Sequence, residues 1–160
     1  MISFKRRVVW LGAGLVSLAC SSGGGNGVGL VGTWTFTSGS VTPMMCSVLG
    51  LSITTSFPLA GQELPIVKGA DSSHVEVSAG SCPVTFTVTG TSASAAPGQA
   101  CNVSFGGISA PVTISSWTLT LTGDTLTSSL SGSAPTGGPS CTLSGAGTLT
   151  PSAPDASAGG

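Results

Sequence analysis

The strongest pattern in the chain is an alternation of apolar and polar residues along several short segments. In residues 82–90, Val84, Phe86 and Val88 alternate with threonines. The same two-residue period occurs in residues 30–37 (LVGTWTFT) and 115–123 (SSWTLTLTG). Because successive side chains of a strand point to opposite faces, each segment predicts a strand with one buried face and one threonine-rich, solvated face.

Six further segments have weaker strand character: residues 46–57, 64–67, 74–78, 99–105, 125–131 and 141–150. Turn-forming residues separate the strands, at 38–40, 60–62, 94–98, 122–124 and 134–139. No window of the part that follows the first 20 residues has a convincing helical period of apolar residues. We therefore predict an all-β domain over residues 30–150. Its fold is an antiparallel meander of eight or nine strands, either closed as a barrel or folded as a sandwich.

The first 19 residues have the order of a secretory signal. Lys5, Arg6 and Arg7 precede an uncharged run over residues 8–19. That run is too short to span the roughly 30 Å of a bilayer core as a mature helix. A basic segment followed by a short apolar one predicts a signal peptide over residues 1–19.

The end of this segment, VSLAC at residues 16–20, resembles the lipobox of bacterial lipoprotein precursors. It departs from the usual pattern at Ser17, where that family most often has leucine. The resemblance implies cleavage before Cys20, thioether lipidation of its sulfur and acylation of the new amino terminus. A buried methylene contributes about 0.8 kcal/mol, so stable anchoring needs more than one acyl chain. The alternative is an ordinary signal peptide cut after Ala19, which leaves Cys20 to pair elsewhere.

The lipoprotein resemblance also implies a location. Ser21 after the cysteine favours the outer membrane over the inner one where the cell has both. Residues 20–29 are rich in glycine and predict a flexible tether between the membrane and the domain. Residues 151–160 contain few bulky apolar side chains and predict a disordered tail.

The small number of basic residues limits the classes of molecule that the chain can bind. Removal of residues 1–19 leaves Lys68 as the one cation against five acids, a net charge near −4. Binding to phosphate backbones requires several cationic side chains, which argues against a nucleic-acid partner. The partners that we expect are the membrane, through the lipid anchor at Cys20, and either a small apolar ligand or a protein or polysaccharide of the cell envelope.

Four other cysteines follow the anchor: Cys46, Cys82, Cys101 and Cys141. An even number in an exported chain predicts two disulfides, with three possible pairings. A meander favours Cys82 with Cys101, which brace neighbouring strands, and Cys46 with Cys141. A metal site is the alternative, but no C-x-x-C spacing occurs and the chain has one histidine.

The strand at residues 30–37 carries a second resemblance. Its Gly32-Thr33-Trp34 triplet is similar to the G-x-W of lipocalin-like proteins. That resemblance implies an eight-stranded barrel with tryptophan across its closed end and a cavity for a ligand. The chain lacks the T-D-Y-like segment of that family and a basic residue to cover the tryptophan. We expect the large aromatic residues to form the core or, alternatively, to line a pocket for an apolar ligand. These residues are Trp34, Phe36, Phe86 and Trp117.

Candidate chemistry is sparse. His74 and Glu76, two residues apart on a predicted strand, share a face with Asp71 nearby. They make a possible zinc site, against the simpler interpretation of a solvated outer face. No G-x-S-x-G motif occurs, and the acids are scattered. We therefore expect a non-enzymatic protein without cofactor or metal: a lipid-anchored envelope module with a binding or structural role. The alternative is a lipocalin-like carrier of a small apolar ligand.

Overall fold

The computed structural model describes residues 29–48, 50–79, 82–105, 108–135 and 140–152. Within these ranges the chain forms eleven strands and no helix. The strands are β1 (Gly32–Phe36), β2 (Val41–Val48), β3 (Leu51–Pro58), β4 (Glu63–Lys68), β5 (His74–Ala79), β6 (Cys82–Thr89), β7 (Ser92–Ala95), β8 (Ala100–Phe105), β9 (Ile108–Thr122), β10 (Thr125–Pro135) and β11 (Ser140–Pro151).

Eight of these strands close a barrel, in the order β1-β4-β5-β6-β7-β9-β10-β11 and back to β1. Every pairing is antiparallel, and barrel neighbours follow one another along the chain once β2, β3 and β8 are set aside. The closing pairs join Trp34 to Pro151 and Phe36 to Leu149. The prediction of an all-β antiparallel meander is confirmed. It closes as a barrel, consistent with a lipocalin-like one, and does not form a sandwich.

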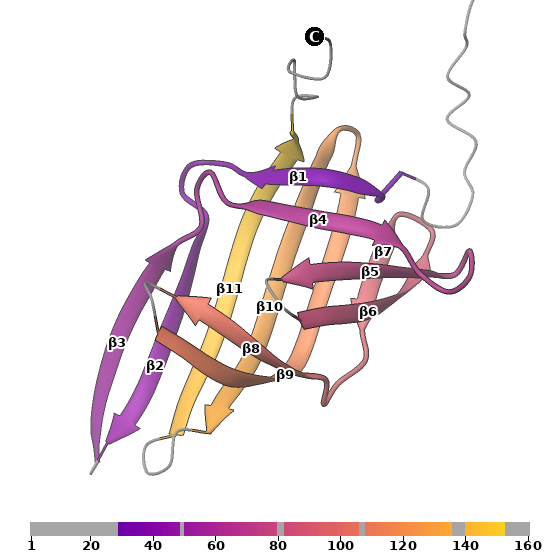
Figure 1. Ribbon diagram of the computed structural model, residues 1–160. Coiled ribbons are helices and arrows are strands. Elements are labelled where there is room, and N and C mark those ends of the chain that lie inside the picture. Colours follow the sequence, from indigo (N-terminus) through magenta and orange to yellow (C-terminus); the bar gives the residue numbers. More distant parts are fainter. Residues whose placement is uncertain (1–28, 49, 80–81, 106–107, 136–139, 153–160) are drawn as a thin grey trace, which may run out of the picture.

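Three barrel strands continue past the barrel: β9 with 15 residues, β10 with 11 and β11 with 12. Beyond the barrel the first half of β9 pairs with β8, the first half of β11 pairs with β2, and β2 pairs with β3. In Figure 1 β2 and β3 lie to the left of the strands β1, β4, β5 and β6 that cross the front of the barrel, and β8 lies below β6. We call β2, β3, β8 and these ends of β9, β10 and β11 the extension.

The buried apolar residues form two clusters, and Leu130 packs against both of them. In β6 the predicted alternation places Val84, Phe86 and Val88 inside the barrel, where they are buried, while the threonines between them are exposed. These side chains belong to one buried cluster, to which all eight barrel strands contribute and also Cys101 of β8. The extension has a smaller buried cluster, composed of Val112, Ala134, Cys141 and Leu143.

Both buried tryptophans have a partner for the indole N–H. Trp34 Nε1 donates to the carbonyl oxygen of Leu30 at 2.9 Å. Trp117 Nε1 donates to Ser128 Oγ, also at 2.9 Å. A buried donor without a partner costs about 1–3 kcal/mol, so these bonds allow tryptophan to fill the interior.

Some details of the predicted strands are wrong. Strand β2 begins at Val41 and β9 at Ile108, earlier than the predicted starts at residues 46 and 115. Residues 46–57, expected as one strand, belong to the β2–β3 hairpin, which turns at Gly50 with a positive φ of 81°. Strand β7 was not expected, because its four residues are serines and alanines without a large side chain. The total is accordingly eleven strands, of which eight form the closed barrel.

The predicted signal peptide, Cys20, nearly all of the tether and residues 153–160 of the predicted tail lie outside the described residues. In the described part, no helix has the length and apolar character needed to cross a membrane.

Candidate functional site

Cys46 and Cys141 form a disulfide in the extension. They lie directly opposite each other on β2 and β11, with Cα atoms 4.0 Å apart, and they join positions 95 residues apart in the sequence. Cys101 on β8 is also disulfide-bonded and buried. The side chain of Cys82 lies outside the described residues, so its expected pairing with Cys101 stays a prediction. The Cys46–Cys141 bond is the pairing that the sequence favoured.

The four aromatic residues singled out from the sequence all lie in the barrel core. Phe86 and Trp117 are in contact, with ring centroids 5.2 Å apart and the rings at 71°. Edge-to-face pairs of this kind contribute about 0.5–1.5 kcal/mol beyond the burial of their area. Trp34 and Phe36 come from β1, next to the strand β11 that closes the barrel.

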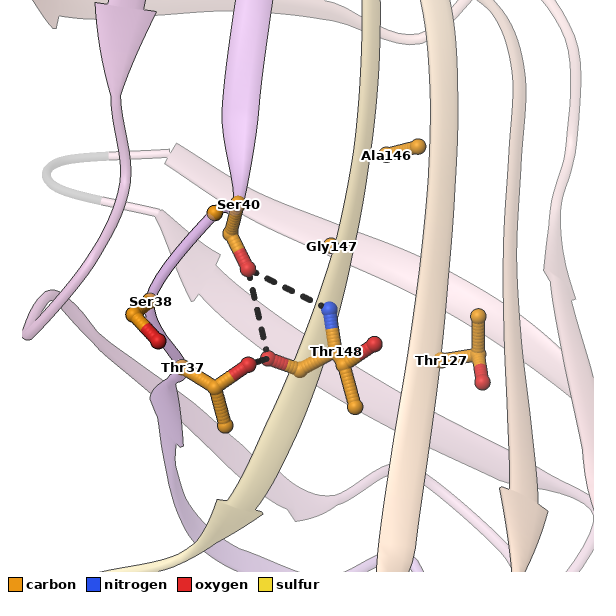
Figure 2. A pocket seen from close by; sticks show the side chains of 8 residues that line it. Thr37, Ser38, Ser40, Thr127, Ala146, Gly147 and Thr148 are labelled. Carbon is orange, nitrogen blue, oxygen red and sulfur yellow. Dashed lines mark hydrogen bonds between the residues drawn. The ribbon is translucent and has the colours of Figure 1, made fainter.

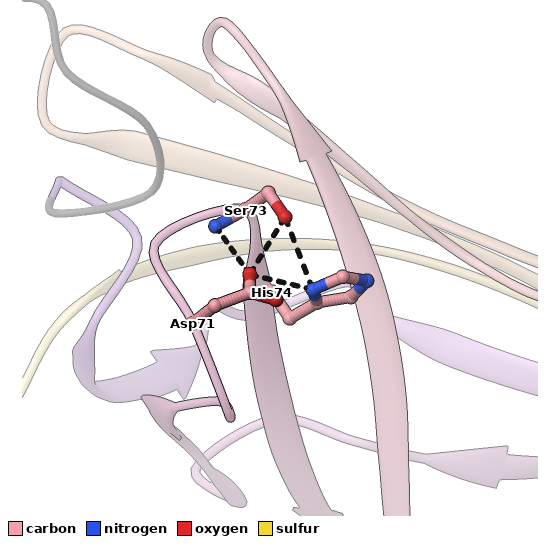
Figure 3. A network of polar contacts seen from close by, with 3 residues as sticks. All are labelled: Asp71, Ser73 and His74. Atoms are coloured by element: carbon pink, nitrogen blue, oxygen red, sulfur yellow. Dashed lines mark hydrogen bonds and ion pairs between the residues drawn. The ribbon is translucent and has the colours of Figure 1, made fainter.

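Asp71, Ser73 and His74 form a polar cluster in the β4–β5 turn (Figure 3). Asp71 Oδ1 accepts hydrogen bonds from the backbone N–H of Ser73 at 2.8 Å and from its hydroxyl at 2.6 Å. His74 Nδ1 lies 2.7 Å from the same oxygen. These bonds, first from the Ser73 side chain and then from His74, lower the pKa of Asp71 to about 2.

The geometry of this cluster is that of a hydrogen-bonded turn and differs from that of a catalytic triad. In a serine–histidine–aspartate triad the hydroxyl and the carboxylate lie at opposite ring nitrogens. Here the Ser73 hydroxyl, at 3.1 Å, and the carboxylate both lie at Nδ1 of His74. The buried neighbours Val75 and Val77 point inward, which places His74 and Glu76 on the outer face as predicted. Among the described residues, no group of three or more histidine, cysteine, aspartate or glutamate residues is arranged to hold a metal.

A different site forms where the barrel meets the extension. Strand β11 pairs with β2 up to Ala146 and with β1 from Leu149 onward. Between these pairings, the β1–β2 turn supplies the hydrogen-bond partners of Thr148. The Thr148 carbonyl accepts from the Thr37 N–H at 2.8 Å and from the Thr37 hydroxyl at 3.0 Å. The Thr148 N–H donates to Ser40 Oγ at 3.3 Å.

This turn and the outer faces of β10 and β11 border an open hollow of about 310 Å³ on the surface, which we call the junction hollow (Figure 2). Its lining consists of small residues, most of them with hydroxyl groups: Thr37, Ser38, Gly39, Ser40, Thr127, Ala146, Gly147 and Thr148. The lining contains no titratable side chain. The hollow therefore offers hydroxyl and backbone groups for hydrogen bonding, without an acid, a base or a strong metal ligand.

Gly147 is required at the floor of this site. A Cβ atom there would lie 2.7 Å from the ring of Phe36 and 3.0 Å from Ser40 Cβ. Both distances are shorter than an ordinary carbon contact of about 3.5–4.0 Å. Glycine at this position thus lets the buried Phe36 ring and the β1–β2 turn approach the backbone of β11.

The sequence did not predict the junction hollow. Residues 38–40 are predicted only as a turn, and nothing along the chain connects them to residues 146–148. One signal was present: glycines at 145 and 147 interrupt the apolar face of β11 between Leu143 and Leu149. Glycine inside a strand marks a close approach of other backbone.

The chain was compared with protein-family models, with curated proteins and with solved structures, and none of the three comparisons gave a match.

Proposed function

We propose that this protein is a lipid-anchored, non-enzymatic module of the cell envelope, held in the outer membrane through Cys20. The proposed role is to bind a neutral, hydroxyl-rich partner, such as an envelope polysaccharide, at the junction hollow.

The anchor is supported by the sequence that precedes the domain. Residues 16–20 resemble a lipobox, and the first barrel strand begins at Gly32. The short glycine-rich segment between Cys20 and that strand is long enough to hold the domain off a bilayer surface and too short to let it diffuse far.

The binding role rests on one observation, the hydroxyl-rich and uncharged lining of the junction hollow. The side chains of Thr127 and Thr148 are exposed on neighbouring strands, and Ser38 is exposed on the turn above them. Hydroxyl groups both donate and accept hydrogen bonds, as do the hydroxyls of a carbohydrate. A charged ligand would find no counter-charge among the lining residues.

Packing in the barrel favours this role over carriage of a small apolar ligand. A carrier needs space among its inward side chains, and pockets for such ligands measure about 300–1,000 Å³. The inward side chains of Phe86, Leu119 and Leu126 are fully buried and belong to one contiguous cluster. Trp117, which belongs to the same cluster, is in contact with Phe86 and hydrogen-bonded to Ser128.

The binding role can be tested by NMR titration of the isotopically labelled chain with a neutral oligosaccharide, such as a dextran fragment. We expect shifts of the amide signals of residues 37–40 and 146–148. Replacement of Thr127 by Val removes a lining hydroxyl and should weaken the shifts several-fold. Thr118→Val, on the exposed face of β9 outside the lining, is the matched control and should leave them unchanged. Shifts confined to the barrel interior would contradict a site at the junction hollow, and an absence of shifts for several such sugars would contradict carbohydrate binding.

A further inference from the structure

Strand β3 is the last strand at one end of the sheet, and it pairs with β2 over its whole length. In the described part of the chain no other strand pairs with it. All of its residues except Phe57 are exposed, including Leu51 at 71% and Ile53 at 56%. In Figure 1 it forms the left border of the extension.

The spacing of the disulfide pair identifies the backbone groups of β3 that face outward. In an antiparallel ladder, Cα atoms are about 4.5 Å apart at a non-hydrogen-bonded pair and about 5.5 Å at a hydrogen-bonded one. The 4.0 Å between Cys46 and Cys141 therefore marks a non-hydrogen-bonded pair. The peptide groups of Cys46 then point away from β11, toward Ile53 on β3.

The same alternation continues along both strands. The Leu59 N–H donates to the Ser40 carbonyl at 2.9 Å, just past the ends of the two strands. This bond joins an even-numbered residue to an odd-numbered one, as expected if even-numbered residues of β2 bond to odd-numbered residues of β3. The N–H and C=O groups of Ser52, Thr54 and Ser56 consequently point to the open edge. Their side chains are also exposed, on the face of β3 opposite Leu51 and Ile53.

This edge lacks the features that usually prevent pairing with another chain. Such features are charged side chains, a proline within the strand or a bulge. Neither β2 nor β3 contains a charged residue, and the only proline of β3 is its last residue, Pro58. The eight pairs of β2 with β3 follow without a register shift.

We propose that β3 is a self-association edge, through which two copies of this chain pair β3 to β3 in antiparallel orientation about a twofold axis at Thr54. In this register Thr54 lies opposite Thr54 of the second copy, and Ser52 lies opposite the second copy's Ser56. All the outward peptide groups of these residues then find partners. On the other face, Leu51 meets Phe57 and Ile53 meets Thr55.

A second copy of this chain is the partner that fits this edge, because the residues along the edge are arranged symmetrically. Hydroxyl residues at 52, 54 and 56 are evenly placed about Thr54, and a twofold axis there matches hydroxyl with hydroxyl and apolar side with apolar side. A neighbouring register centred on Thr55 would oppose Ser52 to Pro58, which has no N–H to donate. The absence of charge also gives the edge no electrostatic preference for a different chain.

The axis at Thr54 permits a charge-swap experiment. Thr54 is exposed, and its N–H lies outside the β2–β3 ladder, so T54K and T54E should both fold. Each variant places two like charges opposite each other across the axis. In sedimentation velocity at about 1–100 μM, in a detergent that keeps an acylated chain dispersed, we expect the wild-type chain to form dimers with rising concentration. Each variant alone should be monomeric, and an equimolar mixture should form the mixed dimer.

Thr54→Ala is the matched control, because it keeps the N–H and adds no charge, and it should dimerise like the wild type. Tryptophan fluorescence checks that each variant is folded, through Trp34 and Trp117. A wild-type chain that stays monomeric overturns the proposal, as do variants that dimerise alone. Charged variants whose mixture stays monomeric overturn the register at Thr54.

Discussion

The backbone N–H of Thr148 donates to the hydroxyl of Ser40 at 3.3 Å, at the point where β11 exchanges one neighbouring strand for another. Ser40 is buried, at 4% exposure, and its hydroxyl also lies 3.4 Å from the Thr148 carbonyl. One side chain thus takes the place of a missing ladder partner between β1 and β2. The contact lies on β11, the strand that continues from the extension into the barrel.

Removal of this hydroxyl should therefore destabilise the protein. In Ser40→Ala the Thr148 N–H loses its partner in a partly buried place, which costs about 1–2 kcal/mol. Urea unfolding followed by tryptophan fluorescence measures the change. Ser38→Ala, on the exposed part of the same turn, is the control and should change stability by less than about 0.5 kcal/mol. Equal effects of the two substitutions would contradict the role given to Ser40.

Gly147 should not tolerate a side chain. In Gly147→Ala the new Cβ overlaps the Phe36 ring, and overpacking of this kind costs about 1–3 kcal/mol. Phe36→Leu should relieve part of this cost, so that the two substitutions are not additive in urea unfolding. Ala146→Val, on the outward face of the same strand, is the control for a change in strand propensity. Additive effects of G147A and F36L would argue against the contact.

The Cys46–Cys141 disulfide should stabilise the extension. Replacement of both cysteines by alanine removes a cross-link that closes a long loop, and about 2–4 kcal/mol of stability should be lost. Hydrogen exchange should show the loss of protection in β2 and β3 first, because their contact with the rest of the fold is through β11. Uniform loss over the barrel strands β4–β6 would contradict this division into two clusters.

Acidification should open the β4–β5 turn at low pH. The pKa of Asp71 is lowered to about 2 by hydrogen bonds from Ser73 and His74, so the folded state favours the ionised carboxylate. The resulting stabilisation is fully present above pH 4, near the ordinary pKa of 3.8, and is lost as the pH falls toward 2. NMR signals of residues 71–74 should titrate in that window. In Asp71→Asn this titration should disappear, whereas Asp124→Asn, in another exposed turn, should leave it in place. A carboxyl at residue 71 that titrates near pH 4 would contradict these contacts.

The parts of the fold that could be predicted are those carried by local alternation. Val84, Phe86 and Val88 lie on the inner face because strand geometry alone requires it once the strand is recognised. The same period identified β1 and the barrel part of β9. Strand β7 gave no such signal, because Ala93 and Ala95 are buried by their neighbours without being large.

The remaining features depend on contacts that are distant in sequence. The extension exists because β9, β10 and β11 are longer than the barrel needs, and β2, β3 and β8 extend the sheet on either side. The junction hollow brings the turn after β1 against residues more than a hundred positions later. The alternation of apolar and polar residues within one segment does not predict which distant segment it contacts. Gly145 and Gly147 nevertheless marked the place where this contact occurs.

We propose above that the domain is tethered to a membrane through Cys20. Intact-mass and peptide mass spectrometry of the full chain, expressed in a bacterial host with two membranes and extracted from its membrane fraction, tests this claim most directly. We expect an amino-terminal peptide that begins at Cys20 and carries a diacylglyceryl group and an amide-linked acyl chain. In Cys20→Ala neither the lipid nor this cleavage should occur. A mature chain that begins at Cys20 without lipid and is recovered free of the membrane would contradict the claim.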